Sequence, residues 1–287
     1  MARKGKNTLD TILKEEEENS PVVTDANIGA APQGNEALKE VYDKMHHEGP
    51  GAWFDDGAEE RELILKMGEP WSDGYGGLEV LEIGCGEGWL SELIATRTVK
   101  VTGIDYSEEA IKKAKLREKH FLMFECINYR DINFRFDRIV MQGVLEHLDN
   151  PFVELKWMMD NLLVDGGDVI TSSPMFVNPR GFVWMALHAV GAVMSKTDLH
   201  FLNPWDFEGF CKDNGYSLKW TSCNHSWANG VRMIEDFRKR LPLALRDGGI
   251  HIDVNKLAEL FRWLAGSGPM IELGSNLGAT AVYRISK

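Results

Sequence analysis

One short segment, residues 80–90, constrains the fold of this chain more than its composition does. It reads VLEIGCGEGWL, an apolar run that contains Glu82 and is followed by Gly84, Gly86 and Gly88. Glycine tolerates a positive φ and lets a ligand approach the backbone closely. The segment therefore predicts a strand, a tight turn and a helix, and it indicates a site for a nucleotide-type cofactor. A tight turn without a ligand is the alternative interpretation of the glycines alone.

A second acidic residue, Asp105, ends the next apolar run, residues 99–105. A carboxylate at this place accepts hydrogen bonds from ribose hydroxyls. The glycine spacing is G-x-G-x-G, which differs from the G-x-G-x-x-G of dinucleotide-binding folds, and Glu82 would repel a pyrophosphate. The same carboxylate attracts a cationic amine. S-adenosylmethionine (SAM) carries such an amine together with a sulfonium, so these residues predict a SAM site.

Further motifs follow the glycine segment as far as residue 174. They are VTGIDYS at 101–107, FDRIV at 136–140, VLEHL at 144–148, LLVDGG at 162–167 and ITSSP at 170–174. In this order and spacing the motifs resemble the class I SAM-dependent methyltransferases, and within them the ubiquinone-biosynthesis O-methyltransferase-like group. The resemblance implies an α/β fold, a doubly wound Rossmann-like seven-stranded sheet with helical lid insertions, whose last strand is antiparallel to its neighbours. It also implies SAM as cofactor and S-adenosyl-L-homocysteine as product.

The alternation of strand-like and helix-like segments agrees with a doubly wound parallel sheet. Strands are expected at residues 79–83, 100–105, 122–127, 136–141, 167–171, 218–223 and 280–285, and intervening helices at 89–95, 108–118 and 152–163. Right-handed crossovers place the carboxyl ends of the first, second and fourth strands at one edge of the sheet. We expect the ligand to bind at this edge.

The cofactor contacts can be assigned along this edge. Glu82 is expected to bind the methionine amine and Asp105 the ribose. The backbone of the glycine turn is expected to contact the cofactor at Gly84, Cys85, Gly86 and Gly88. Tyr106 follows the ribose-binding acid and would flank the adenine, with packing as the alternative role.

By the resemblance, two residue pairs complete the cofactor site. Asn128 and Tyr129 stand where the family often has an acidic residue that accepts the adenine amino group. The amide oxygen of Asn128 can accept the same hydrogen bond, and an Asn selected for the turn alone is the alternative. Gln142 and Gly143 would line the methionine end through backbone groups.

Two histidines are candidates for catalysis. His147 lies near the cofactor edge, and an imidazole can remove a proton at neutral pH. The alternative is structural, because His147 belongs to a motif that positions the loop. His200 matches a place where related enzymes put a histidine facing the substrate. A base is needed only for a protonated nucleophile, because the sulfonium already makes the methyl group reactive. The neighbours His46 and His47 are expected at the surface.

No metal site is predicted. Some related enzymes bind a metal through carboxylates and histidines around the Glu-His segment. Here Gly143 stands three positions before Glu146, where the first carboxylate ligand would be, and Glu146 with His147 would be too few ligands for a tightly held ion.

Composition limits the remaining function classes. The 287 residues carry a net charge of -12, which disfavours nucleic acid as a substrate. The four cysteines show no C-x-x-C spacing, which favours a reducing, cytoplasmic location. The N-terminus carries no apolar signal segment, and the apolar stretch 181–194 is too short to cross a membrane.

The domain organisation is expected to be a flexible leader at residues 1–34 and a methyltransferase domain at 35–287. The domain would carry an N-terminal lid at 35–70 and cap insertions at 175–203 and 227–272. These caps are rich in apolar and aromatic residues, which suggests an apolar or aromatic acceptor. Packing onto the core is the alternative, and weak contact of 181–194 with a membrane surface is another.

The main functional hypothesis is therefore methyl transfer from SAM to a small-molecule acceptor, at oxygen rather than at nitrogen or carbon. Methylation of a protein or RNA is a second hypothesis. A SAM-binding module without turnover is a third. The acceptor itself does not follow from the residues.

Overall fold

The computed structural model describes residues 35–48, 57–72, 77–97, 100–195, 197–267 and 272–287. The expected leader, residues 1–34, lies outside the described residues. The chain divides into two compact units. The larger unit comprises Pro32–Met175, Thr197–Asn224 and Thr280–Lys287, and the smaller unit includes Phe176–Lys196 and His225–Ala279.

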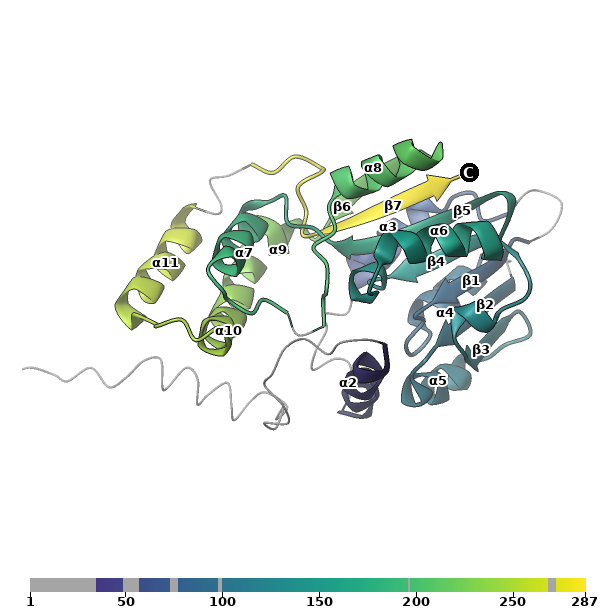
Figure 1. Ribbon diagram of the computed structural model, residues 1–287, viewed down its shortest axis with the longest axis horizontal. Helices are drawn as coiled ribbons and strands as arrows, with labels where there is room; N and C mark the ends of the chain where they lie inside the picture. Colours follow the sequence, from purple (N-terminus) through teal and green to yellow (C-terminus); the bar gives the residue numbers. More distant parts are fainter. Residues whose placement is uncertain (1–34, 49–56, 73–76, 98–99, 196, 268–271) are drawn as a thin grey trace, which may run out of the picture. The chain divides into compact units, whose positions relative to one another are not determined.

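The larger unit is built on a seven-stranded sheet with the order β3-β2-β1-β4-β5-β7-β6 (Figure 1). The strands are β1 (Glu79–Ile83), β2 (Lys100–Asp105), β3 (Leu122–Cys126), β4 (Phe136–Gln142), β5 (Leu163–Pro174), β6 (Ser217–Cys223) and β7 (Thr280–Ser286). Neighbours among β1 to β5 pair in parallel, whereas β7 is antiparallel to both β5 and β6. This order confirms the predicted α/β, doubly wound, Rossmann-like sheet.

Helices cover both faces of this sheet. The helices of the larger unit are α2 (Asn35–Glu48), α3 (Ala58–Met67), α4 (Trp89–Ala95), α5 (Glu108–Ala114), α6 (Pro151–Leu162) and α8 (Pro204–Asn214), with short 3-10 turns η2 (Lys115–Arg117), η3 (Tyr129–Asp131) and η4 (Leu145–His147).

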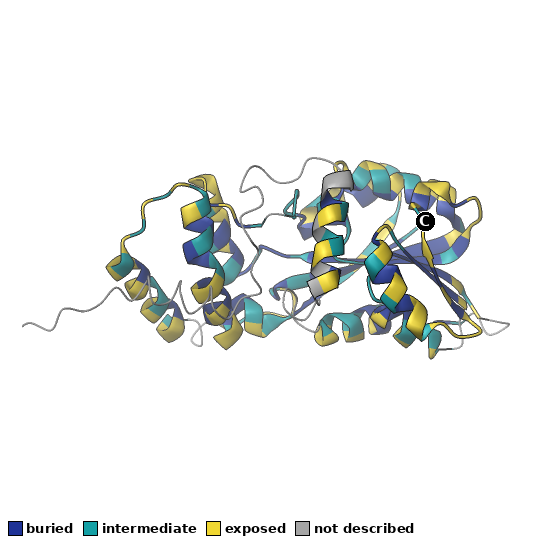
Figure 2. Cartoon of the chain, turned by 90° about the horizontal axis from the view of Figure 1, so that it is seen from below, coloured by how far each residue is buried: buried dark blue, intermediate teal, exposed yellow. Residues whose placement is uncertain are grey.

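The two faces can be told apart from neighbouring residues of β7. Helices α3, α4 and α5 share one apolar cluster with the sheet, and Val282 belongs to it. The next residue, Tyr283, stacks on Phe207 of α8 with ring centroids 3.8 Å apart, and Phe152 of α6 packs against Phe207. Because successive side chains of a strand point to opposite faces, α6 and α8 cover the face opposite to α3, α4 and α5. Figure 2 shows the strands buried between these helices, whose outer surfaces are exposed.

Polar caps and prolines begin several of the helices. The Ser107 hydroxyl accepts the Ala110 N–H at the start of α5. Asn203 and Asp206 form a reciprocal capping box at α8. These side chains satisfy backbone N–H groups that have no partner within the helix. Prolines stand at the first helical position, where no N–H is needed, at residues 151, 179 and 204.

The predicted and observed element boundaries differ most at two places. Strand β5 begins at Leu163, earlier than predicted, and its pairing with β4 shifts register between Phe136 and Arg138. A bulge around Gly166, which has a φ of 77°, accommodates the extra residues. Helix α5 ends at Ala114 and continues as the 3-10 turn η2, so the predicted helix at 108–118 tightens in its last turn.

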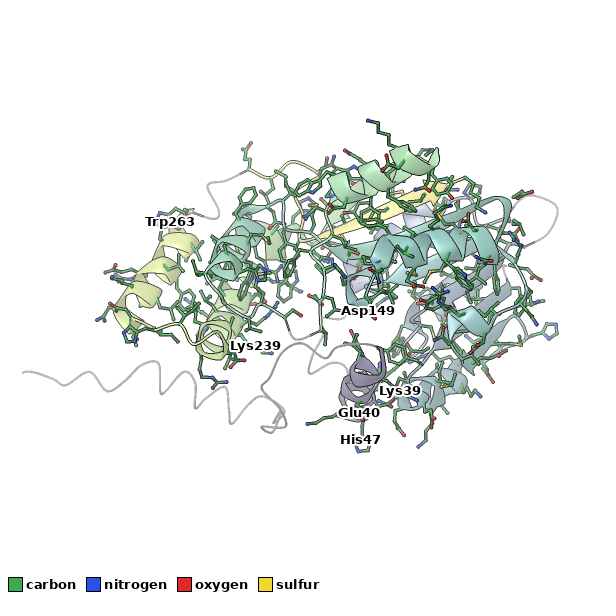
Figure 3. All side chains as sticks on the ribbon, in the orientation of Figure 1. Lys39, Glu40, His47, Asp149, Lys239 and Trp263 are labelled. Carbon is green, nitrogen blue, oxygen red and sulfur yellow. The ribbon has the colours of Figure 1, made fainter. Side chains whose placement is uncertain are left out.

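The smaller unit is helical. It contains α7 (Pro179–Ala189), α9 (His225–Asn229), α10 (Val231–Asp247) and α11 (Val254–Ser267). Trp184 of α7 packs on Phe237 of α10 with ring centroids 5.4 Å apart. Asp236 is buried beside them and accepts from Arg180 at 2.9 Å. Trp263 of α11 is 63% exposed (Figure 3). No helix in the described part of the chain combines the length and apolar character that crossing a membrane requires.

Candidate cofactor and catalytic site

The glycine turn after β1 contains three positive φ angles, 71° at Gly84, 52° at Gly86 and 82° at Gly88. A Cβ on Gly84 would lie 2.6 Å from Val144 Cγ2, and one on Gly88 would lie 2.5 Å from Phe124 Cζ. Packing alone therefore requires these two glycines. The nearest atom to a Cβ on Gly86 would be His46 Cε1 at 3.6 Å, which leaves ordinary contact space. Of the three, Gly86 is the position where a ligand could approach the backbone.

Glu82 lies on β1 directly before this turn and is 2% exposed. Its Oε2 accepts the hydroxyl of Ser91 on α4, and burial raises the pKa of Glu82 to about 8. Arg61 lowers this pKa from a distance, but within the described residues Glu82 accepts hydrogen bonds from the hydroxyl and the backbone N–H of Ser91 and not from a cation. A buried carboxyl group with this environment gains most from an incoming ammonium group.

Asp105 ends β2 and braces the glycine turn. Its Oδ2 accepts the Gly86 N–H at 2.9 Å, and its Oδ1 accepts the Ser107 N–H at 2.8 Å. Burial raises the pKa of Asp105. Each carboxylate oxygen has a second acceptor position, so these bonds leave capacity for the hydroxyls of a ribose.

The residues expected around the adenine occupy different environments. Tyr106 is 36% exposed and lies edge-on to Tyr42 with ring centroids 6.1 Å apart. The Asn128 side-chain oxygen accepts the Arg130 N–H at 2.9 Å, which is the turn role that the sequence left open. The Tyr129 hydroxyl donates to Glu154 Oε2 of α6 at 2.6 Å, so its polar end is already engaged there.

The expected methionine-end residues lie next to α3 and β5. Gln142 Nε2 donates to Glu60 Oε2 of α3 at 2.9 Å, and burial raises the pKa of Glu60. The Gly143 N–H donates to the Ser172 hydroxyl at 3.2 Å and to its carbonyl at 3.3 Å. Cys85 is buried within the turn.

The two candidate catalytic histidines both lie close to Glu146 but are held differently. His147 Nδ1 lies 2.9 Å from the Thr197 carbonyl oxygen, and Nε2 lies 2.9 Å from the Tyr42 hydroxyl. The backbone N–H of His200 donates to the Glu146 carbonyl, and its Nε2 lies 3.1 Å from the Asp149 carbonyl. Of the two, His147 has a side-chain hydroxyl as a partner, which suits proton transfer, whereas His200 is bound to backbone.

Comparison with known proteins agrees with this geometry. The protein family described as "Methyltransferase domain" matches residues 45–218. The chain belongs to this methyltransferase family. This family uses SAM, and the open position at Gly86, the buried Glu82 and the acceptor capacity of Asp105 fit that cofactor.

Curated relatives of this methyltransferase include two ubiquinone biosynthesis O-methyltransferases. The one from Leptothrix cholodnii is 31% identical over 162 residues, which are 50% of this chain and 66% of the relative. The one from Idiomarina loihiensis is 30% identical over 172 residues, which are 53% of this chain and 69% of the relative. The alignments thus span about two thirds of the length of these relatives.

Solved structures share the fold of this methyltransferase at low identity. A methyltransferase in complex with the Trm112 activator of Haloferax volcanii has a TM-score of 0.57 at 16% identity and covers 85% of this chain and 96% of its own. The [4+2]-cyclase SpnF has a TM-score of 0.54 at 16% identity, over 91% and 98% of the two chains. Phosphoethanolamine N-methyltransferase 2 of Haemonchus contortus, solved with SAM, has a TM-score of 0.51 at 14% identity, over 79% and 52%. These likenesses show the fold alone.

Helix α2 of the methyltransferase adds residues that the sequence did not assign to the site. The Ser107 hydroxyl donates to Asp43, and Lys113 Nζ donates to the His46 carbonyl. His46 is 8% exposed, with its Nδ1 3.5 Å from Glu87 Oε1, so the expectation of a surface position was wrong for this residue. Lys39, Glu40 and His47 also lie on α2 (Figure 3). The helical spacing of Tyr42 and His46, which places them on one face, was the available signal.

The described part of the methyltransferase holds no group of three or more His, Cys, Asp or Glu side chains arranged to bind a metal ion. Glu146 is instead 3% exposed and accepts the Ser173 hydroxyl at 3.1 Å. Burial raises the pKa of Glu146 to about 7.

Proposed function

We propose that this chain transfers the methyl group of SAM to a hydroxyl group on a small, apolar or aromatic acceptor. The observation that carries the choice of oxygen is the setting of His147. Its Nδ1 faces a carbonyl oxygen and its Nε2 faces a hydroxyl, which is the arrangement of a neutral imidazole that can take up a proton. The names of the curated O-methyltransferases support the same choice. The apolar and aromatic residues of the segments 175–203 and 227–272 in the sequence are the reason for expecting an apolar acceptor.

Each residue at the carboxyl edge of the sheet would bind a different part of the cofactor. Glu82 would bind the methionine ammonium, Asp105 the ribose hydroxyls, and the backbone at Gly86 would contact the cofactor closely. Tyr106 would flank the adenine. The bound cofactor supplies a methyl group on a sulfonium, which is already a good leaving group.

His147 would be the final acceptor of the proton that the acceptor hydroxyl releases when its oxygen is methylated. Placing the oxygen in line with the methyl group and excluding water supply the remaining acceleration.

The test combines binding with transfer. Calorimetry should show that the full chain binds SAM, and a tritium-transfer assay should show label in catechol or alkylated phenol probes. His147→Asn should lower transfer about 100-fold or more, the usual contribution of a general base. The matched control is His120→Asn, which replaces an exposed histidine on the surface of the larger unit.

Three outcomes would count against the proposal. Label in tRNA or peptide but not in the phenols would favour a macromolecular acceptor. SAM binding with no S-adenosylhomocysteine formed from any acceptor, including a crude metabolite extract, would favour a binding module without turnover. Full activity of His147→Asn would exclude His147 as the base.

A further inference from the structure

Both ring nitrogens of His147 are already engaged. Nδ1 lies 2.9 Å from the Thr197 carbonyl oxygen, and Nε2 lies 2.9 Å from the Tyr42 hydroxyl. The Tyr42 and His147 rings meet edge-on with centroids 5.7 Å apart, so the contact is a packed one. No nitrogen of His147 is therefore left to meet an acceptor hydroxyl directly.

The partners determine which nitrogen carries the proton. A carbonyl oxygen can only accept, so Nδ1 donates to Thr197 and the neutral ring has its lone pair on Nε2. The Tyr42 hydroxyl then donates to Nε2. Asp198 Oδ1 lies 3.5 Å from Nδ1, close enough to stabilise the ring once it becomes cationic. Burial, with negative charge at Glu146 and Asp198, raises the pKa of Tyr42, which keeps it a donor.

Helix α2 holds Tyr42 at this place through contacts to the cofactor turn. Asp43 accepts the Ser107 hydroxyl, two residues beyond Asp105, whose Oδ1 accepts the Ser107 N–H at 2.8 Å. One turn of α2 further on, His46 lies beside Gly86 and its carbonyl accepts Lys113 Nζ. The helix that carries the Tyr42 hydroxyl is thus attached to the segment expected to bind the ribose.

We propose that Tyr42 is a catalytic residue that receives the acceptor proton and relays it to His147. In one step the acceptor O–H bond breaks and a new O–H bond forms at Tyr42, while the original Tyr42 proton moves to His147 Nε2. The acceptor oxygen uses its electron pair to bond the methyl carbon, and the sulfur keeps the pair of the broken bond. The relay ends with neutral Tyr42 and a cationic imidazole next to Asp198. It rests on the proposed hydroxyl acceptor.

Nitrogen-15 NMR of histidine-labelled full chain tests the hydrogen bond independently of turnover. His147 should show a protonated Nδ1 and an Nε2 that accepts a hydrogen bond, with its signals assigned by their loss in His147→Asn. Tyr42→Phe, which keeps the ring but removes the hydroxyl, should move the Nε2 signal toward that of a nitrogen without a donor. Tyr216→Phe is the matched control, since that hydroxyl lies 3.5 Å from Asp160. A protonated Nε2, or an Nε2 signal that Tyr42→Phe leaves in place, would overturn the relay.

Turnover then tests the proton path. Tyr42→Phe should lower kcat for catechol about 100-fold, with the Kd for SAM unchanged. The loss should be much smaller for 4-nitrocatechol, which ionises without help. Tyr42→Phe with His147→Asn should lose no more than the stronger single variant, because the two act as one unit.

Multiplied losses in the double variant, or equal losses for the two catechols, would show a structural role for Tyr42. A wild-type chain that methylates neither catechol would instead contradict the proposed acceptor class, and the NMR measurement would still decide whether Tyr42 holds His147.

Discussion

Buried charged groups have different partners at the two ends of the sheet in the larger unit. Near the start of β4, Arg138 binds Asp168 through two bonds of 2.5 and 2.9 Å, and Arg284 binds the same carboxylate at 2.6 Å. At the other end, the carboxyl groups of Glu82 and Glu146 are equally buried, but the side chains that donate to them are the hydroxyls of Ser91 and Ser173.

This difference separates the charged groups that stabilise the fold from the carboxyl groups that are available to a ligand. At the first end each buried charge has an opposite charge in contact, which compensates for its loss of hydration. At the carboxyl edge burial raises the pKa of Glu82 to about 8 and that of Glu146 to about 7, and it raises the pKa of Glu60, whose carboxylate accepts from Gln142. Buried carboxyl groups with raised pKa values are typical of a functional site that binds a ligand.

The largest effect should come from breaking an ion pair at the paired end of the sheet, the end that holds Arg138, Asp168 and Arg284. Arg138→Met leaves Asp168 buried with one cation fewer, and it removes the donor to the Gly68 carbonyl. The free energy of unfolding, from chemical denaturation, should fall by about 3–5 kcal/mol. The affinity of the folded protein for SAM should stay the same.

The matched control for this prediction is Lys100→Met, which removes an exposed ion pair of 3.0 Å with Glu79. That change should cost less than about 1 kcal/mol. If Arg138→Met and Lys100→Met lowered the free energy of unfolding equally, the buried pair would stabilise the fold no more than the exposed pair does. That result would contradict the comparison.

A smaller effect, on binding rather than on folding, should come from the carboxyl edge. Asp105→Ala should weaken SAM binding by about 1.5–3 kcal/mol, the range for hydrogen bonds to a charged group. Calorimetry of the variant checks this, with Asp165→Ala, at an exposed position on β5, as control. Asp105→Asn, which keeps one acceptor for the turn, separates bracing of Gly86 from contact with ribose. Unchanged affinity in Asp105→Ala would remove Asp105 from the cofactor site.

The sequence predicted the carboxyl edge better than the paired end, because the residues of the carboxyl edge lie within short segments of the chain and those of the paired end are far apart in the sequence. Glu82 and Asp105 each lie at or near the end of a short segment whose residues are mostly apolar, and such segments are typical of strands buried on both faces. Arg138 and Asp168 are 30 positions apart, and Arg284 and Asp168 are 116 apart. No local pattern joins residues at such separations, and only the strand order β4-β5-β7 brings them together.

The same reason explains what was missed in the candidate site. Tyr42 and His147 are 105 positions apart. The helical spacing of Tyr42 and His46 indicated a shared face, but it did not show that this face lies beside the glycine turn. The sequence predicted the turn, but it could not show which of the three glycines are required by packing and which one a ligand could approach. Only the neighbours Val144 and Phe124 show that packing demands two of them. The leader, the lid at 35–70 and the caps at 175–203 and 227–272 stay predictions.

The last expected effect depends on pH and sharpens the comparison at Glu82. Because the pKa of Glu82 is raised from 4.5 to about 8, the folded protein keeps a proton that the unfolded chain has released at intermediate pH. The unfolded state then binds fewer protons, so stability falls as pH rises from about 4.5 to about 8, by at most about 1.4 kcal/mol per pH unit. Glu82→Gln keeps an acceptor for Ser91 and removes the titration.

The free energy of unfolding of Glu82→Gln relative to wild type should therefore rise across this pH window and level off above it. Chemical denaturation at a series of pH values measures the difference. Glu92→Gln provides the opposite sign at pH values below about 4.5, because the hydrogen bond from Lys119 lowers the pKa of Glu92 and its ionised form stabilises the fold. A difference for Glu82→Gln that stays flat with pH would mean that Glu82 is already ionised in the folded protein. The carboxyl edge would then hold its charge as the paired end does, and the contrast between the two ends would not extend to Glu82.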